Sequence, residues 1–284
     1  MTPDQEQIRD EQRATWNKFS PGWRKWDEFT MAFLQPMGDE IVAALRLQPT
    51  DAVLDIATGT GEPGLSIAAA LPSGRVIGTD LAEGMLATAR LRAAERGLSN
   101  YETKIADVSA LPFPDATFDA VSCRMGFMFF PDMALAAREI LRVLKPGGRF
   151  ATSVWNAPGH NPWIVVMMAG IKPHVALPVP APDAPGMFRC AAPGLIAGLL
   201  AAAGFADVAD KEISGQVTYD SPEHYWTMMT EVAAPVVAAM SRASEAERGR
   251  IKADVFAALG SGGGPVTLKF GSRIISSLKP GSAR

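Results

Sequence analysis

Two glycines and an acid in the first third of the chain have the types and spacing of a site for a small ligand. Residues 53–64 read as an apolar strand, a sharp turn and the first turn of a helix. In the turn, Gly59 and Gly61 let the backbone bend tightly and let a ligand approach it closely. Asp80 follows about twenty residues later at the end of a second apolar strand, where an acid can accept hydrogen bonds from a ribose. The pattern predicts a ligand site at the carboxyl ends of parallel strands.

Two cofactors fit this turn, because NAD and S-adenosylmethionine both carry a ribose diol. Glu62 stands at the start of the helix, where a dinucleotide would place its pyrophosphate. A carboxylate there repels phosphates and favours a sulfonium or an ammonium, although it is also an ordinary partner of the helix dipole. Asp107 follows the third expected strand, where it can accept from an adenine amino group or stabilise a turn. These acids favour S-adenosylmethionine and leave an NAD-dependent oxidoreductase as an alternative.

Strand and helix patterns alternate along the chain. We expect strands at residues 51–56, 75–80, 101–105, 118–123, 149–155, 205–213 and 266–278, and helices at 62–71, 82–96, 131–144 and 194–203. This alternation predicts an α/β fold with a doubly wound parallel sheet. Residues 4–48 also have a helical pattern, and Pro21 and Pro36 are expected to break that segment into pieces.

Four segments, in this order, resemble the motifs of class I S-adenosylmethionine-dependent methyltransferases. Residues 53–62 are similar to the glycine motif of that family, 79–86 to its ribose segment, 106–113 to its adenine segment, and 142–148 to the turn before its fifth strand. The sequence most resembles the ubiquinone/menaquinone C-methyltransferase-like group (methyltransferase domain 11/25), which often has alanine where Ala57 stands. The resemblance implies a Rossmann-like, seven-stranded mixed sheet whose last strand is antiparallel. It also implies a methyltransferase that uses S-adenosyl-L-methionine.

The resemblance assigns roles to residues of the expected site. Asp80 would accept the ribose hydroxyls, Asp107 with the backbone of Val108 would bind adenine, and Leu81 with Met85 would enclose the ring. Asp55 would support either the glycine turn or the ammonium group of the cofactor. The expected cofactor-binding set is completed by Ala57, Thr58, Gly59, Thr60 and Gly61 of the turn, and by Phe19 and Trp26 of an aromatic N-terminal face.

Two more residues are candidates for direct roles in methyl transfer. Arg124 follows the fourth strand and is placed to reach a carboxylate. The quinone-modifying group usually has an Arg-Asn pair there, whereas Met125 follows Arg124 in this chain, so the sequence departs from that group on the acceptor side. His160 follows the fifth strand and is the candidate general base, which is needed only if the acceptor is a poor nucleophile. The alternative for His160 is an exposed loop histidine.

The composition of the chain changes along its length and suggests four parts. We expect an N-terminal helical flap at residues 1–48, a cofactor-binding core at 49–156, an apolar lid at 157–193, and the rest of the core at 194–284 with a helical insertion at 221–259. The lid is a long proline-rich connection, which is typical of binding loops. Both insertions are rich in methionine, which either fills a core or adapts to an irregular apolar ligand. We therefore expect a small, largely apolar acceptor, an aromatic one included.

The overall composition argues against several other partners. The 284 residues carry a net charge of −3 with no evident basic face, so nucleic acid is not an expected acceptor or partner. Cys123 and Cys190 lack the spacing of metal ligands, so no metal is expected. The apolar run at residues 191–204 is too short to span a bilayer and the N-terminus is polar, so we expect a cytoplasmic protein without membrane contact. The oligomeric state stays open, and an inactive accessory subunit of the same fold remains an alternative.

Overall fold

The computed structural model describes residues 2–178, 181, 183–260 and 262–281, and the chain forms two compact units. The first unit comprises Met1–Trp155, Pro185–Ile213 and Ser272–Arg284, and the second comprises Asn156–Ala184 and Ser214–Gly271. All of the expected cofactor-binding residues belong to the first unit. Residues 179, 180 and 182 of the expected lid lie outside the described residues.

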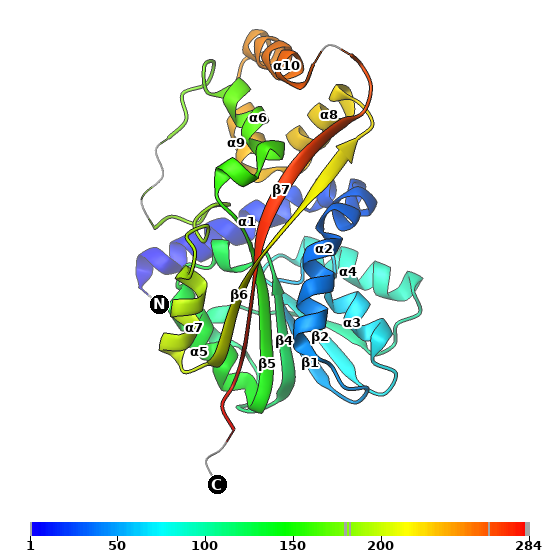
Figure 1. The fold of residues 1–284 in the computed structure, drawn as a ribbon, viewed down its shortest axis with the longest axis vertical. Helices are drawn as coiled ribbons and strands as arrows, with labels where there is room; N and C mark the ends of the chain where they lie inside the picture. Colours follow the sequence, from blue (N-terminus) through cyan, green and yellow to red (C-terminus); the bar gives the residue numbers. More distant parts are fainter. Residues whose placement is uncertain (1, 179–180, 182, 261, 282–284) are drawn as a thin grey trace. The chain divides into compact units, whose positions relative to one another are not determined.

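A seven-stranded sheet has the order β3-β2-β1-β4-β5-β7-β6 (Figure 1). Its strands are β1 (Ala52–Ile56), β2 (Arg75–Asp80), β3 (Tyr101–Ile105), β4 (Phe118–Arg124), β5 (Leu144–Trp155), β6 (Ala206–Tyr219) and β7 (Val266–Leu278). Strands β1 to β5 pair in parallel, and β7 pairs antiparallel with β5. The expected mixed sheet with an antiparallel last strand is therefore confirmed.

The order of the strands reverses at β1, which lies between β2 and β4. Helices α3 (Gly64–Ala70), α4 (Glu83–Glu95) and α5 (Met133–Val143) connect the parallel strands, and the short 3₁₀ helices η1 (Val108–Ala110) and η2 (Phe127–Phe129) follow β3 and β4. Open α/β sheets bind their ligands beyond the carboxyl ends of the strands, where the order reverses. The topology therefore points to the loops that follow β1 and its neighbours.

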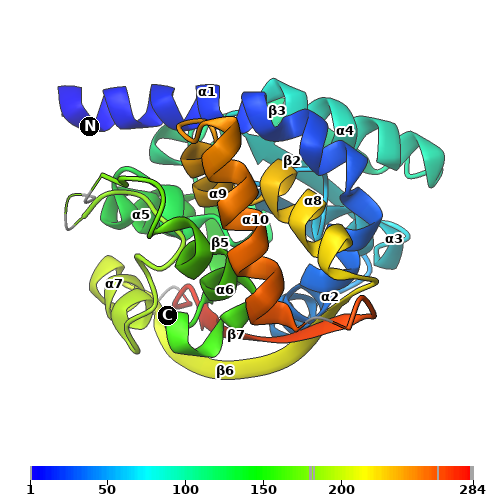
Figure 2. The same ribbon diagram turned by 90° about the horizontal axis from the view of Figure 1, so that it is seen from above.

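The N-terminal segment forms two long helices, α1 (Pro3–Lys25) and α2 (Asp27–Leu45). The expectation that Pro21 and Pro36 break this segment is wrong, because each lies inside a helix. Pro21 lacks the N–H that would bond to the carbonyl of Asn17, and the Ser20 hydroxyl donates to that carbonyl at 2.9 Å instead. Viewed from above, α1 runs beside α4 (Figure 2). The segment is therefore packed along the helices of the first unit.

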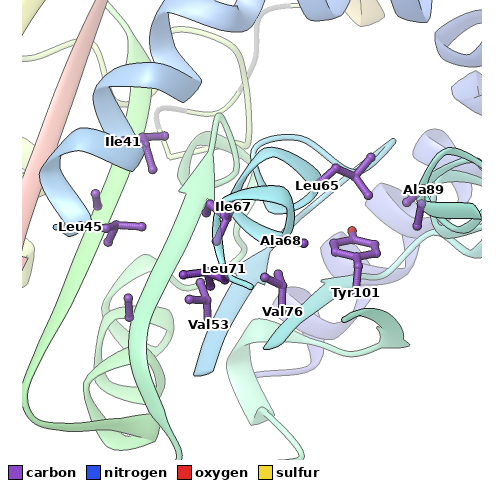
Figure 3. Close-up of a cluster of buried hydrophobic side chains, with 13 residues drawn as sticks. Ile41, Leu45, Val53, Leu65, Ile67, Ala68, Leu71, Val76, Ala89 and Tyr101 are labelled. Atoms are coloured by element: carbon purple, nitrogen blue, oxygen red, sulfur yellow. The ribbon is translucent and has the colours of Figure 1, made fainter. Parts of the chain in front are cut away.

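A cluster of buried apolar side chains joins α2, α3 and α4 to the sheet (Figure 3). Ile41 and Leu45 come from α2, Leu65 and Ile67 from α3, and Val53 from β1. Each of these side chains is at most 1% exposed. Burying each one contributes roughly 1.5–3 kcal/mol of hydrophobic free energy. The cluster fixes β1 and α3, and with them the two ends of the glycine turn.

Two strands are longer than the sequence predicts. β5 begins at Leu144, directly after α5, so the expected turn at residues 145–148 lies within the strand. The β4–β5 register shifts between Phe118 and Ala120, and Gly147 has a positive φ of 80°, so the start of β5 is irregular. β6 continues to Tyr219 instead of ending at residue 213. Helix α7 (Leu195–Ala203) ends at a left-handed glycine, as expected.

The second unit consists mainly of helices. They are η3 (Pro158–His160), α6 (Pro162–Ile171), α8 (Pro222–Val232), α9 (Ala234–Met240) and α10 (Glu245–Leu259). The Tyr225 hydroxyl donates to the carbonyl of Trp163 at 2.8 Å. Met167, Met228 and Met229 are buried in this unit, so they help to fill its interior. No helix in the described part of the chain is long and apolar enough to cross a membrane.

Candidate ligand site

The glycine turn after β1 has a left-handed backbone at three positions, and packing demands a glycine at Gly61. Ala57, Gly59 and Gly61 all have positive φ, at 53°, 57° and 117°. A Cβ on Gly61 would lie 2.5 Å from Cδ1 of Leu65, so a side chain there would collide with α3. A Cβ on Gly59 would meet no heavy atom within 4 Å. The turn therefore leaves open space at Gly59, which is the kind of cradle that a ligand can enter.

Asp55, on β1, forms hydrogen bonds with this turn and with the start of α3. Its carboxylate is fully buried and accepts hydrogen bonds from the Thr58 hydroxyl at 2.5 Å and from the backbone N–H of Gly64 at 3.1 Å. The Ser122 hydroxyl on β4 donates to its other oxygen at 2.6 Å. Burial raises the pKa of Asp55 to about 6, although these hydrogen bonds oppose the rise. Of the two roles expected for Asp55, the hydrogen bonds correspond to support of the turn.

Asp80, at the end of β2, accepts a hydrogen bond from the same turn. Its Oδ2 accepts from the backbone N–H of Gly59 at 3.0 Å, and its Oδ1 accepts from that of Ala82 at 2.9 Å. Burial raises the pKa of Asp80. Each carboxylate oxygen can accept more than one hydrogen bond, so both retain capacity for ligand hydroxyls. Leu81 is half-buried, and Met85 is buried one turn into α4.

Asp107 lies at the end of the next loop, where it begins η1. Its Oδ1 accepts from the backbone N–H of Ser109 at 2.8 Å, which caps the 3₁₀ helix. Its Oδ2 lies 3.7 Å from Nη1 of Arg9 on α1. Val108 is buried. Both roles considered for Asp107 are thus compatible, because one oxygen stabilises the turn and the other has only a distant cationic partner.

The N-terminal helix α1 touches the segments that follow β2 and β3. In addition to the Arg9–Asp107 pair, the Asn17 side-chain oxygen accepts from the backbone N–H of Gly84 at 2.9 Å. Phe19 is buried and packs edge-on against Trp16, while Trp26 is half-buried with the Lys25 ammonium 5.3 Å from its ring. Sequence reasoning proposed aromatic contacts for this helix and missed its polar ones. A lone arginine or asparagine on a helix gives no signal in the sequence.

Glu62, just before α3, makes contacts that correspond to one of the two roles considered for it. Its Oε1 pairs with Nη1 of Arg96 on α4 at 2.6 Å, and its Oε2 accepts from the backbone N–H of Ser66 at 3.1 Å. The carboxylate is therefore engaged by α4 and by the start of α3. These contacts correspond to the helix-dipole alternative, in which the acid stabilises the N-terminal end of α3. A phosphate at this helix end would still meet a negative charge.

Arg124 ends β4, next to the carboxyl end of β1. Its Nη2 lies 3.2 Å from the sulfur of Met31 on α2, and the Thr60 hydroxyl approaches the same sulfur at 4.0 Å. Met31 is thus a neighbour of both the glycine turn and Arg124, and sequence reasoning did not find it. Burial lowers the pKa of Arg124, but a guanidinium remains charged in proteins.

His160 belongs to the second unit, whereas Arg124 and the glycine turn belong to the first. It ends η3 and its side chain is exposed. Its role as a general base stays a prediction. Among the described residues, no group of three or more histidine, cysteine or acidic side chains could hold a metal ion.

Comparison with known proteins gives a family model, curated relatives and solved structures that match this chain. Residues 53–148 match the model described as methyltransferase domain. An uncharacterised protein of Mycobacterium tuberculosis is 36% identical over 160 residues, which cover 56% of this chain and 57% of the relative. The demethylmenaquinone methyltransferase of Thermus thermophilus is 45% identical over 106 residues, which cover 37% of this chain and 48% of the relative. The chain therefore spans about half the length of the curated relatives that it matches.

Solved structures share the fold over most of the chain. The YcgJ protein of Bacillus subtilis aligns with a TM-score of 0.57 at 22% identity, covering 86% of this chain and 97% of that one. The [4+2]-cyclase SpnF aligns with a TM-score of 0.55 at 25% identity, covering 87% of this chain and 81% of that one. Likeness at this level establishes the fold, and one fold can serve different reactions.

Proposed function

We propose that this chain, whose residues 53–148 carry the methyltransferase domain of the class I S-adenosylmethionine-dependent methyltransferases, transfers a methyl group from S-adenosylmethionine to a small, largely apolar acceptor. The observation that carries the proposal is the link between Asp80 and the glycine turn. The N–H of Gly59 donates to Asp80 while the space beside Gly59 is open. If a nucleoside bound there, its ribose could donate hydrogen bonds to Asp80. The rest of the ligand could then lie against the backbone of Gly59, which has no side chain.

The residues fit this cofactor better than a dinucleotide. Asp80 keeps lone pairs for two ribose hydroxyls, and Asp107 keeps an oxygen for the adenine amino group. Glu62, although paired with Arg96, puts a carboxylate where the pyrophosphate of NAD would lie. S-adenosylmethionine has no phosphate and meets no such repulsion. This difference supports the methyl donor over NAD.

The bound cofactor would supply a methyl group already activated by its positive sulfur. The protein must then align the acceptor and keep water away. Asp80 and Asp107 would hold the two ends of the nucleoside, and Leu81 with Met85 would enclose the adenine ring. Asp55 keeps the glycine turn rigid through Thr58 and Gly64. Alignment of two reactants in attack geometry can account for about 7–11 kcal/mol of a barrier.

The acceptor proposal draws on the relatives and on the second unit. A relative named demethylmenaquinone methyltransferase supports a quinone-like acceptor, but its match covers only 37% of this chain. Met125 follows Arg124 in place of the asparagine usual in the quinone-modifying group. We therefore propose a small, largely apolar acceptor without naming a quinone. For an acceptor that is a poor nucleophile, we propose His160 as the general base.

A second function, without methyl transfer, is favoured by one comparison. SpnF shares this fold over most of the chain and is named as a [4+2]-cyclase. A protein of this fold could thus bind the cofactor and serve another reaction, or serve as an accessory subunit. Transfer of labelled methyl groups into an extract of the producing cell separates the two proposals. Labelled product supports methyl transfer, and cofactor binding without product supports the second function.

Thermal unfolding tests the choice of cofactor directly. S-adenosylhomocysteine at about 100 times its Kd should stabilise the protein by about 2.7 kcal/mol, which corresponds to an increase of roughly 5 to 10 °C in Tm. NADH should have no effect. Stabilisation by NADH alone would overturn the proposal.

His160 is tested by comparing His160→Ala with His174→Ala. His174 belongs to the same unit and pairs with Asp254 at 2.6 Å, so it is a matched control. We expect His160→Ala to lower kcat with unchanged affinity for S-adenosylhomocysteine, and His174→Ala to lower neither. Equal kcat in both variants would remove His160 from the mechanism.

A further inference from the structure

We infer that Arg124 is an oxyanion-binding residue, whose guanidinium binds a carboxylate or a similar oxyanion of a ligand in the site. The inference rests on the proposed function, because that function supplies the two ligands considered below. It goes beyond that function by stating which chemical group one of these two ligands presents to Arg124 and by naming the residue that binds that group.

Among the described residues, the side-chain contact of Arg124 gives its donors no strong acceptor. The guanidinium carries five N–H donors, and its contact is the thioether sulfur of Met31, 3.2 Å from Nη2. A thioether is a weak acceptor and carries no charge. The side chain is half-buried at the carboxyl end of β4, so water reaches it only in part. A partly buried cation without an anionic partner is costly and is stabilised by a ligand that brings one.

The nearby carboxylates form ion pairs or hydrogen bonds with groups other than Arg124. Glu62, Asp55 and Asp27 act on Arg124 electrostatically and oppose the effect of burial on its pKa. Glu62 pairs with Arg96, and Asp27 pairs with Arg92 on α4. Asp55 accepts from the hydroxyls of Thr58 and Ser122. Within the described residues, none of these acids forms an ion pair with Arg124.

The position of Arg124 places a ligand oxyanion beside the glycine turn. Met31 links the two, because its sulfur lies 3.2 Å from Nη2 of Arg124 and 4.0 Å from the Thr60 hydroxyl. A planar guanidinium can bind both oxygens of a carboxylate at once. Two ligands could supply that group: the amino-acid end of the methyl donor, or an acidic acceptor such as a carboxylate. Both sources have the same chemistry, and the experiment separates them.

The experiment measures binding of two matched probe pairs by calorimetry. S-adenosylmethionine and decarboxylated S-adenosylmethionine differ in one carboxylate on the methyl donor. Benzoate and benzamide, added in the presence and absence of S-adenosylhomocysteine, differ in the same way on the acceptor side. The variants are Arg124→Met, which removes the charge, and Arg124→Lys, which keeps it without the planar fork. Arg90→Met is the control, because Arg90 is an exposed arginine that pairs with Glu83.

Wild-type protein should prefer the carboxylate member of one pair, and Arg124→Met should lose about ten- to a hundredfold in affinity for that member. The carboxylate-free member should bind both proteins equally, and Arg124→Lys should fall between them. A loss in the first pair identifies the methyl donor as the source, and a loss in the second identifies the acceptor. Arg90→Met should behave as wild type. Thermal unfolding of each variant checks that it is folded.

Two outcomes overturn the inference. One is a wild-type protein that discriminates in neither pair, and the other is an Arg124→Met variant that binds the probes as wild type does. Failure of the proposed function looks different. In that case neither form of S-adenosylmethionine binds the wild-type protein, while benzoate still reports on Arg124 without the cofactor.

Discussion

Arg9 in the N-terminal helix lies 3.7 Å from the carboxylate of Asp107, the residue proposed to bind adenine. The same helix accepts a hydrogen bond from Gly84 through Asn17, beside the proposed ribose segment. Helix α1 is therefore held to the first unit at two points of the candidate cofactor site. Any ligand amino group that bonds to Oδ2 of Asp107 must share that oxygen with Arg9.

The first prediction concerns this competition. Arg9→Met should tighten binding of S-adenosylhomocysteine by about two- to fivefold at low salt, because it frees the Asp107 oxygen from a long, partly exposed ion pair. High salt should tighten binding to the wild type in the same way and leave the variant unchanged. Arg13→Met is the control, since Arg13 lies on the same helix and shares Asp10 with Arg9, at 3.4 Å and 3.0 Å, whereas of the two only Arg9 approaches Asp107 in the described structure. Weaker binding by Arg9→Met would show that Arg9 contributes to the site instead of competing for it.

A second prediction separates the contribution of Asp80 to ligand binding from its contribution to stability. Asp80→Ala should lower the affinity for S-adenosylhomocysteine by at least about tenfold, because a charged acceptor of two ribose hydroxyls is lost. The variant should also lose some stability, since Gly59 and Ala82 both donate to this carboxylate. Asp80→Asn keeps one oxygen and should keep more of both properties. Calorimetry and urea unfolding measure them side by side, and unchanged affinity in Asp80→Ala would refute the ribose assignment.

The third prediction follows from the buried carboxyl of Asp55. Folding raises its pKa from 3.8 to about 6, so the folded state holds this proton more tightly than the unfolded state. The resulting stabilisation is present below about pH 4 and is lost as the pH rises through about 6. A difference of this size is worth about 3 kcal/mol.

Asp55→Asn should therefore gain stability relative to the wild type as the pH rises from about 4 to 7, by up to about 3 kcal/mol. Asparagine keeps an oxygen for Thr58 and Gly64, and its amide can donate to Ser122. The comparison between the two proteins cancels the rise that burial causes in the pKa of Asp80, because both proteins share that residue. Urea unfolding at several pH values measures the difference, and parallel stability curves would contradict the pKa assigned to Asp55.

Most of the sheet could be predicted from the sequence because most of its strands have a local sequence signal. Apolar runs end at Ile56 and Asp80, and the last strand, Val266–Leu278, was placed at its observed bounds. The errors arose where the signal for a break is offset by a contact that the sequence pattern does not show. Pro21 signals a helix end because it cannot donate a hydrogen bond to the carbonyl of Asn17. The Ser20 hydroxyl donates to that carbonyl, and the helix continues. The turn at residues 145–148 signals a stop, but β4 pairs with Leu144 before it and with Arg149 after it, so the turn is an irregular segment inside β5.

The candidate site shows the same division between local and distant signals. The glycine turn and the acids after β2 and β3 stand at fixed distances along the chain, so their pattern predicts a ligand. Met31 and Arg9 reach the site from helices far away in the sequence, and their residue types carry no special meaning. For Glu62 the residue type and its place before a helix were informative. Its ion pair with Arg96 on α4 could not be predicted, because no local pattern indicates that contact. Contacts made by long side chains depend on helix packing, which a local pattern does not contain.

The last prediction uses two glycines with the same backbone conformation. Gly59 has a φ of 57° and Gly97 a φ of 66°, and a Cβ on either would meet no atom within 4 Å. Gly59→Ala and Gly97→Ala should therefore cost similar amounts of stability, about 1–2 kcal/mol each. They should differ in binding, because the open space beside Gly59 is where the proposed cofactor lies, whereas Gly97 follows α4 at the surface. Calorimetry with S-adenosylhomocysteine should give a loss of at least about tenfold for Gly59→Ala. Gly97→Ala should bind as the wild type does, and equal affinities in the two variants would move the ligand away from the glycine turn.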